Sequence, residues 1–339
     1  MEFLLISLIK IVVILLVILT VVANLVYVER RFSAFIQNRI GPNRVGPAGL
    51  LQSPADVLKL FIKEDIVPLR ANRFLHTLAP VISIVVALVT FAVIPFGSSI
   101  PMFGRDVKLM IADVNVGVLY ILAFTSLGVY GITLSGWSSN NKYSLLGSLR
   151  ASAQMISYEL SMGLSIIGVI MIAGTLELDR IVELQSRFAW NAFLTPIGFI
   201  TFLVASFAET NRLPFDLPEA EPELVGGYHT EYSGMKFGTF FLAEYANMIT
   251  SSALIVTLFF GGWQVPGLHL LGLSPFWTGI AHVFAFSVKV VLMLLFYIWI
   301  RWTIPRFRYD QLMNLGWKVM LPLSLLNLVV TGCWLLLVG

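Results

Sequence analysis

The residues best suited to chemistry gather in segment 207–235, between two strongly apolar stretches. Arg212 and His229 are the only basic residues within this segment. Carboxyl groups that are buried or crowded together titrate closer to neutral pH, where they can exchange protons. The segment therefore indicates either a set of proton-exchanging groups or a docking surface. It holds six of the 19 acidic residues of the chain: Glu209, Asp216, Glu219, Glu221, Glu223 and Glu231.

The spacing of three of these acids bears on that choice. In an extended chain, Glu219, Glu221 and Glu223 lie on one side, where mutual repulsion favours shared protonation. The alternative is a solvated acidic loop that binds basic partners. Apolar residues are more frequent here than a solvated loop needs, so we expect the loop to be buried. They are Pro214, Phe215, Leu217, Pro218, Leu224 and Val225.

The rest of the chain has the composition of a membrane protein. Of its 339 residues, 58% are hydrophobic and 12% are charged, whereas soluble domains carry about 25% charged residues. Recurring apolar runs predict an all-α polytopic membrane protein, a single membrane domain over 1–339. The first run lacks a small-residue cleavage site, which favours an anchor over a signal peptide. The eight predicted spans are 4–28, 77–97, 114–135, 154–174, 192–208, 238–262, 279–300 and 318–338.

The basic residues predict the orientation of these spans. Most of the 22 lysines and arginines lie in the loops 29–76, 136–153, 209–237 and 301–317. Positive charge marks the cytoplasmic side, so these are the predicted inner loops and both termini are expected outside. The acidic segment is then on the inner side of the membrane.

The first inner loop should contain a short amphipathic helix at the membrane surface. Ser53-Pro54-Ala55-Asp56 has the pattern of a helix start, with Ser53 as N-cap. One helical face of the residues that follow is apolar, which suits a helix lying on lipid headgroups. Such a helix could be an anchor, or it could cover an opening through which a lipid-soluble ligand enters. The apolar residues are Val57, Leu58, Phe61 and Ile62.

Three ionisable residues fall within or near the predicted spans: Glu159, Glu244 and Lys289. A charge at bilayer depth costs roughly 2.5–3.5 kcal/mol on insertion scales, so it is usually paired, neutralised or functional. For Glu159 and Glu244 we favour a proton path, because the acidic segment lies at the same face. For Lys289 a structural ion pair or a neutral amine is the alternative to an ion site.

Arg301, Arg306 and Arg308 alternate with aromatic residues at the start of the last inner loop. Snorkelling arginines in an interfacial aromatic belt explain much of this pattern. Contact with a partner protein or with the polar head of a ligand is the alternative.

Cysteine and histidine usage limits the cofactors that the chain could hold. Cys333 is the only cysteine, so neither a disulfide within the chain nor a cysteine-ligated iron–sulfur or zinc site is expected. The four histidines are far apart in sequence, which argues against a haem, and the chain has no glycine-rich phosphate loop. We therefore expect no catalytic, metal-binding or cofactor-binding residues in the strict sense.

Five long strings resemble one known family. They are ERRFSAFIQNRIGPNRVGP, GWSSNNKYSLLGSLRASAQMISYE, FAETNRLPFDLPEAEPELVGGYHTEYSGMKFG, FLAEYANM and PRFRYDQLMNLGWK. Their order and extent are similar to those of one membrane subunit of respiratory complex I, an NADH:quinone oxidoreductase. That family of subunits is called the H subunit in bacteria and subunit 1 in mitochondria. The string HTEYSGMKFG resembles the bacterial form more closely.

The resemblance implies roles for particular residues. In the family this subunit joins the hydrophilic arm to the membrane arm and forms the inner part of the quinone cavity. Arg30, Arg301 and Asp65 match positions at that cavity, and Asp56 of the predicted surface helix joins them as a candidate quinone-binding residue. A chain of acids leads from the quinone site to the proton channels, and its matches here are Glu159, Glu209, Asp216, Glu219, Glu221, Glu223 and Glu244.

The resemblance also implies partners and location. Quinone is the expected substrate, no cofactor is expected in this chain alone, and FMN and iron–sulfur clusters are expected in partner subunits. Two peripheral-arm subunits, adjacent small membrane subunits and lipids are the expected partners, and nucleic acid is not. The expected location is the bacterial cell inner membrane, with the mitochondrial inner membrane as the less favoured one.

Two alternative functions remain open at this stage. One is a membrane subunit of a ferredoxin- or hydrogenase-linked complex, where the same scaffold works without NADH. The other is a stand-alone ion transporter that uses Glu159, Glu244 and Lys289. A transporter of that kind usually shows internal repeats with broken helices, and the sequence shows no such repeat.

Overall fold

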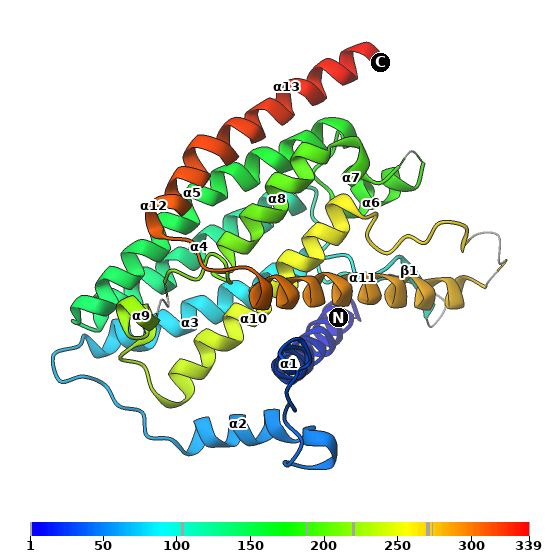
Figure 1. The fold of residues 1–339 in the computed structure, drawn as a ribbon. Coiled ribbons are helices and arrows are strands. Elements are labelled where there is room, and N and C mark those ends of the chain that lie inside the picture. The colour runs from blue at the N-terminus through cyan, green and yellow to red at the C-terminus, as the bar shows by residue number, and fades with distance from the viewer. Residues whose placement is uncertain are drawn as a thin grey trace.

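The computed structural model describes residues 2–102, 105–187, 189–218, 221–268, 272 and 274–338, and they form an almost entirely helical protein (Figure 1). Within these residues, seven helices are long and apolar enough to cross a membrane. Five are single helices, and one is α3 (Arg73–Val89) continued by the 3-10 turn Thr90–Val93. The last is a composite of α12 (Tyr309–Asn314), a π-helical turn (Leu315–Met320) and α13 (Leu321–Val338). The single ones are α1 (Glu2–Ile36), α4 (Gly117–Ser138), α5 (Lys142–Ala173), α10 (Gly234–Phe259) and α11 (Pro275–Thr303).

The predicted span 192–208 corresponds to a broken and shorter structure. Helix α7 (Asn191–Leu194) ends at Thr195, and Pro196 begins α8 (Pro196–Glu209). At 1.5 Å per residue, the 14 residues of α8 extend about 21 Å, less than the roughly 30 Å of a hydrocarbon core. The all-α polytopic prediction is confirmed, with seven long helices and this short apolar one.

Several helices extend into segments that hydropathy predicted to be loops. Helix α1 continues eight residues beyond the predicted end at 28, and α5 begins at Lys142, inside the predicted loop 136–153. In the same way α12 begins at Tyr309, inside the predicted loop 301–317. Hydropathy detects where apolar residues end, whereas a helix continues while its backbone and side chains have partners. These extensions carry charged residues, among them Arg30 and Arg31 on α1 and Arg150 on α5.

Of three smaller elements, one was predicted from the sequence and two were not. The amphipathic helix is α2 (Gln52–Ile62), and its apolar residues Val57, Leu58, Phe61 and Ile62 are all exposed, which fits a membrane-facing side. The prediction of Ser53 as N-cap was wrong, since Ser53 is buried within the first turn and Leu51 precedes the helix. A hairpin of β1 (Ser99–Met102) and β2 (Arg105–Lys108), and the amphipathic helix α6 (Leu178–Arg187), were not predicted.

Helix α5 lies at the centre of one half of the molecule, against α4, α8 and the composite C-terminal helix (Figure 1). Helix α10 packs against α3 and α11, and α1 lies against α10 and α11 with most of its surface exposed. One close approach involves Gly198 of α8, whose amide donates to Oδ1 of Asn327 at 3.0 Å. A Cβ atom at Gly198 would lie 2.9 Å from Nδ2 of Asn327, so a larger residue there would displace the Asn327 amide. This contact ties the broken helix to α13.

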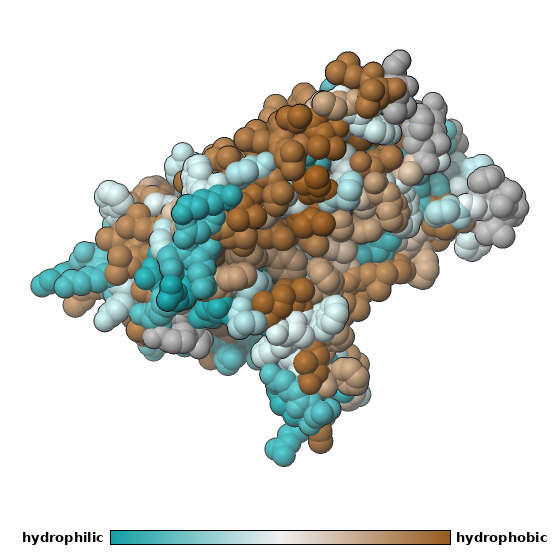
Figure 2. Space-filling view, turned by 45° about the horizontal axis from the view of Figure 1, so that its top comes forward, coloured by the Kyte–Doolittle hydropathy of each residue, from teal (hydrophilic) through white to brown (hydrophobic). Residues whose placement is uncertain are grey.

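The surface has the character expected of a membrane protein. Figure 2 shows hydrophobic residues over most of the visible face, with hydrophilic residues gathered at its left end and on the projection below. Exposed apolar side chains are frequent along α1, α11 and α13, including Leu16, Leu292 and Leu336. Soluble monomers rarely expose apolar area on this scale. These helix faces therefore contact lipid or other membrane subunits.

Candidate functional site

A buried ion-pair network joins three elements that are far apart in sequence. Arg212, in the loop after α8, places its Nη1 atom 3.3 Å from Oε1 of Glu29 on α1. Its Nε atom lies 2.8 Å from Oε1 of Glu244 on α10. The side chains of Arg212 and Glu29 are only 4% and 6% exposed. A charge buried to this extent is stable only when it is paired, so the three residues depend on one another.

Two further residues complete this network around Glu29. Arg301, near the end of α11, donates to Oε1 of Glu29. The hydroxyl of Tyr245 donates to Oε2 of Glu29 at 2.7 Å, and its ring centroid lies 4.3 Å from the Arg212 guanidinium carbon. Burial lowers the pKa of Arg212, but Glu244 and Glu29 raise it more, and it stays well above its ordinary value. Arg212 is therefore a permanent positive charge between two carboxyl groups.

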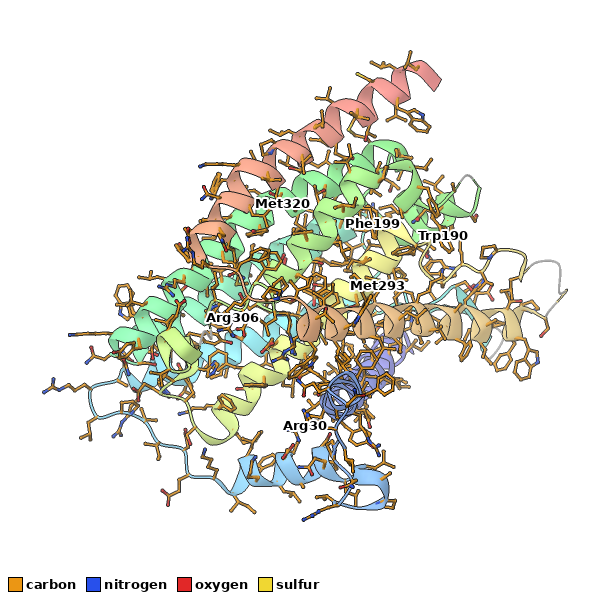
Figure 3. The ribbon with its side chains drawn as sticks, in the orientation of Figure 1. Arg30, Trp190, Phe199, Met293, Arg306 and Met320 are labelled. Carbon is orange, nitrogen blue, oxygen red and sulfur yellow. The ribbon has the colours of Figure 1, made fainter. Side chains whose placement is uncertain are left out.

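Asp216, a buried carboxylate, forms a second ion pair beside this network with the partly exposed Arg306. Its Oδ2 atom accepts from Arg306 at 2.8 Å, and Arg306 lies in the segment that links α11 to α12 (Figure 3). Burial raises the pKa of Asp216 to about 6, although Arg306 lowers it. The neighbouring amide of Phe307 also donates to the main-chain oxygen of Pro214. The loop is thus fixed to the start of the C-terminal helix, and Asp216 titrates near neutral pH.

A small cavity lies between Glu209 and Glu244. Its volume is about 40 Å³, and Thr210, Asn211 and Asn247 add polar groups to its wall. One water needs about 10–15 Å³ of such space, so about three waters fit. Oε2 of Glu209 is buried and makes no hydrogen bond with the residues that the structure describes. Waters in this cavity would give that oxygen partners and connect the two carboxyl groups.

Glu159 does not line this cavity. It lies on α5, is partly exposed, and acts electrostatically on Glu209. Thr125 of α4 hydrogen-bonds to Glu209. A partly exposed carboxyl group in the middle of an apolar helix is costly in lipid. Glu209 therefore has two acidic neighbours, since it shares the cavity with Glu244 and interacts electrostatically with Glu159.

The acidic loop itself is only partly buried. Phe215, Leu217 and Leu224 are buried as expected, but Val225 is exposed. Glu223 is also exposed, and it pairs with Arg150 of α5 at 2.7 Å. The expectation that all three alternating acids share a buried environment is therefore wrong for Glu223. Glu219 lies outside the described residues, and Glu221 begins the short helix α9 (Glu221–Leu224).

The end of the loop is fixed to three neighbouring segments. Asn141, in the turn between α4 and α5, donates to Oε1 of Glu231 at 2.5 Å. The ring of Tyr232 stacks on His76 of α3 with centroids 4.0 Å apart. Ser233 donates to the main-chain oxygen of Glu64 at 2.9 Å. Segment 231–233 is therefore held in place from three directions.

The candidate quinone-binding residues do not form a single cluster. Arg30 and Asp56 form an ion pair of 2.6 Å between α1 and α2 (Figure 3). Arg301 belongs to the buried network, with about a quarter of its side chain exposed. Asp65 lies past the end of α2 and pairs with Lys236 at 2.8 Å. Only Arg301 therefore contacts the network directly, while the others connect α2 to its neighbours.

Sequence reasoning missed the role of Glu29. Its buried position follows from a stripe on α1, because Ile18, Val22 and Leu25 are buried on the same face. Spacings of four, three and four residues are typical of one helical face. An acid that continues such a stripe at the inner end of a span could have been recognised as buried. Its partners could not, since Arg212 and Arg301 are far away in the sequence.

Lys289 does not lie with the acids. Its ammonium donates to the main-chain oxygens of Phe260, Gly262 and Gln264 at 2.7–2.9 Å. These oxygens follow the end of α10, where the helix dipole is negative. Three acceptors match the three donors of a charged ammonium, not a neutral amine. Lys289 therefore caps the end of α10.

His229 gives a prediction about pH. It lies in the acidic loop among the rings of Tyr228, Phe237 and Phe241, and burial lowers its pKa to about 4. An unfolded histidine has a pKa of about 6.5, so the unfolded loop takes up a proton first as pH falls. The stabilising contribution is complete above a pH of about 6.5 and is lost between about 6.5 and 4.

We therefore expect protease cleavage in segment 221–236 to become faster over that pH interval. The protease should be one that is active at acid pH, acting on the purified complex. His229→Phe keeps the aromatic packing without the titration and should flatten the profile. An unchanged profile in His229→Phe would assign the pH effect to other groups.

The fold and the site together define a class of protein. It is a polytopic helical membrane protein that holds a buried network of carboxylates and arginines next to a small polar cavity. Comparison with known proteins gives the family. Residues 9–332 match the model of the family described as NADH dehydrogenase.

Individual relatives agree with this match. NADH-quinone oxidoreductase subunit 8 of Rhodothermus marinus is 56% identical, over 90% of each chain. The H 1 subunit of the same enzyme from Cytophaga hutchinsonii is 53% identical, over 92% of this chain and 91% of the relative. The H 1 subunit from Geobacter metallireducens is 53% identical, over 98% and 97%. The chain belongs to this bacterial family, the H subunits of NADH-quinone oxidoreductase, and the resemblance seen in its motifs is confirmed.

Proposed function

We propose that this chain forms part of the quinone cavity of its complex and couples quinone reduction to proton translocation. The observation that carries the proposal is the network of Glu29, Arg212 and Glu244, which continues through the polar cavity to Glu209. Charged groups in a low-dielectric interior respond strongly to a nearby change of charge. Such a network can convert an event at the inner surface into a change of protonation deeper in the membrane.

Quinone chemistry supplies the change of charge. Reduction of a quinone to a quinol consumes two electrons and two protons, so the surroundings of the reacting head must deliver protons. Arg301, partly exposed at the end of α11, can donate a hydrogen bond to a quinone oxygen while it also holds Glu29. A change at Arg301 is then felt by Glu29, Arg212 and Glu244 in turn. The electrons come, in this proposal, from partner subunits that carry FMN and iron–sulfur clusters.

The proton path that we propose follows the order of the acids. A proton shared by Glu244 and Glu209 moves through waters in the cavity between them. It then reaches Glu159 near the surface of α5, where a neighbouring membrane subunit would receive it. Asp216, whose pKa lies near 6, can exchange protons with the inner side. Each transfer in this route needs a donor and an acceptor within hydrogen-bond reach or one water apart.

The remaining assignments follow from the same proposal. We propose that the protein lies in the cell inner membrane with both termini outside, because the basic loops mark the inner side. Helix α2, which exposes its apolar face, would lie on the membrane beside the opening through which quinone enters. The stand-alone transporter is disfavoured by the helix-capping role of Lys289. A ferredoxin-linked complex would use the same network with a different electron donor.

Photo-crosslinking tests the quinone part of this proposal. An azido-quinone is bound to the isolated membrane complex, activated by light and located by peptide mapping. We expect label in peptides from 30–65 or 209–237, removed by excess unmodified quinone, and none in the outer hairpin at 99–108. Full labelling of partner subunits with none in this chain would contradict a place at the quinone cavity.

A further inference from the structure

One buried side chain closes the loop that carries the network. Gln154 of α5 has no exposed surface. Its amide nitrogen, Nε2, donates to the main-chain oxygens of Ala208 at 2.7 Å and Phe215 at 2.9 Å. The same nitrogen lies 3.2 Å from Oδ1 of Asn211. A single side chain therefore holds both ends of segment 208–215 against α5.

The surroundings of Gln154 require a hydrogen-bond donor. Ala208 and Phe215 present carbonyl oxygens, which can only accept, so the opposite orientation of the amide would place oxygen against oxygen. Its Oε1 atom is buried and makes no hydrogen bond with the described residues. Leaving such an oxygen unpaired costs free energy that a leucine would avoid. Packing alone therefore does not explain an amide at this position.

The closed segment positions the charged groups. Glu209 and Arg212 lie within it, and Asp216 follows it directly. Arg212 must reach Glu29 on α1 and Glu244 on α10 at the same time. A displacement of the segment would lengthen these ion pairs, whose strength in a buried site falls steeply with separation and geometry.

We propose that Gln154 is a positioning residue for proton coupling. It fixes segment 208–215 so that Arg212 bridges the two carboxyl groups and Glu209 faces the cavity. The inference rests on the proposed function, because it assigns to Gln154 the geometry of that network. Gln154 belongs to none of the ion pairs itself and acts only through the backbone that it holds.

The test uses the assembled membrane complex with Gln154→Leu, which removes the donors and keeps most of the buried volume. NADH:quinone turnover per assembled complex is expected to fall about fivefold or more, with proton pumping falling in parallel. Gln185→Leu is the matched control. Gln185 is also a buried amide, which donates to the main-chain oxygen of Thr257 and accepts from Gly261 at the other end of α10. This control should lower assembly while turnover per complex stays within about twofold.

Gln154→Glu adds a second measurement, the pH dependence of turnover, which would not change if Gln154 only filled space. A carboxylic acid has one O–H donor when protonated and none when ionised. Turnover of Gln154→Glu relative to wild type should therefore rise as pH falls from about 8 to about 6, since burial brings a carboxyl pKa toward that range. The corresponding ratio for Gln154→Leu should not depend on pH. This variant also serves if Gln154→Leu does not assemble.

Wild-type turnover in Gln154→Leu overturns the inference. If the leucine variant does not assemble, the inference is overturned when the turnover of Gln154→Glu relative to wild type does not depend on pH. Glu244→Gln, measured in parallel, separates this inference from the proposed function. Impaired pumping in Glu244→Gln with normal Gln154 variants rejects only the positioning role, whereas normal pumping in Glu244→Gln rejects the coupling function itself.

Discussion

Replacing Arg212 with methionine is expected to lower the stability of the protein by about 3–5 kcal/mol, the cost of leaving buried charges without their partner. Glu29 retains Arg301 and Tyr245, but Glu244 loses its ion-pair partner. The loss should appear as a lower thermal midpoint of the purified complex and less assembled complex in the membrane. Total NADH:quinone turnover of the membranes should fall by at least the same factor as the amount of assembled complex.

Two comparisons make this prediction specific. Arg150→Met breaks the ion pair with Glu223, whose members are 31% and 54% exposed, and should cost less than about 1 kcal/mol. The double variant Arg212→Met with Glu244→Gln removes the stranded charge and should regain more than half of the lost stability. Equal destabilisation by the Arg150 and Arg212 variants would contradict a special role for the buried network.

Replacing Lys289 with methionine should be nearly as damaging, for a different reason. Three main-chain oxygens at the end of α10 would lose a charged donor. Hydrogen bonds to charged groups contribute about 1.5–3 kcal/mol each, so we expect a loss of about 3 kcal/mol or more. Thermal unfolding of the detergent-solubilised complex measures it.

Lys10→Met is the matched control for Lys289. Lys10 also lies in an apolar helix, but it makes a single hydrogen bond of 3.1 Å, to the main-chain oxygen of Met110, within the described residues. Its replacement should cost about 1 kcal/mol or less. If both lysine variants lose the same small amount, the cap on α10 is not what Lys289 provides.

Local patterns in the sequence were enough to predict most of the helices. Apolar run length located the long helices, and the period of Val57, Leu58, Phe61 and Ile62 located α2. The break at Pro196 and the extension of α1 and α5 beyond their predicted spans were not predicted. These features depend on tertiary partners, such as Asn327 for α8, which hydropathy does not contain.

The site could be predicted only in part, for a similar reason. An acid in an apolar run is conspicuous, so Glu244 and Glu159 were found from the sequence. Arg212 was noted only as a basic group of the acidic segment, and Glu29 was hidden in the charged string ERR. Their pairing joins residues 183 positions apart. No periodicity reports a contact between distant helices, so the network emerges only from the fold.

The most direct test of the central claim is NADH-driven proton pumping by the assembled complex carrying Glu244→Gln. We predict normal assembly, because Glu29 still pairs with Arg212, and pumping per complex reduced about tenfold or more, because the glutamine cannot carry the proton. Glu183→Gln, at an exposed acid on α6, should pump like wild type. Wild-type pumping by Glu244→Gln would contradict the proposal that this network couples quinone reduction to proton translocation.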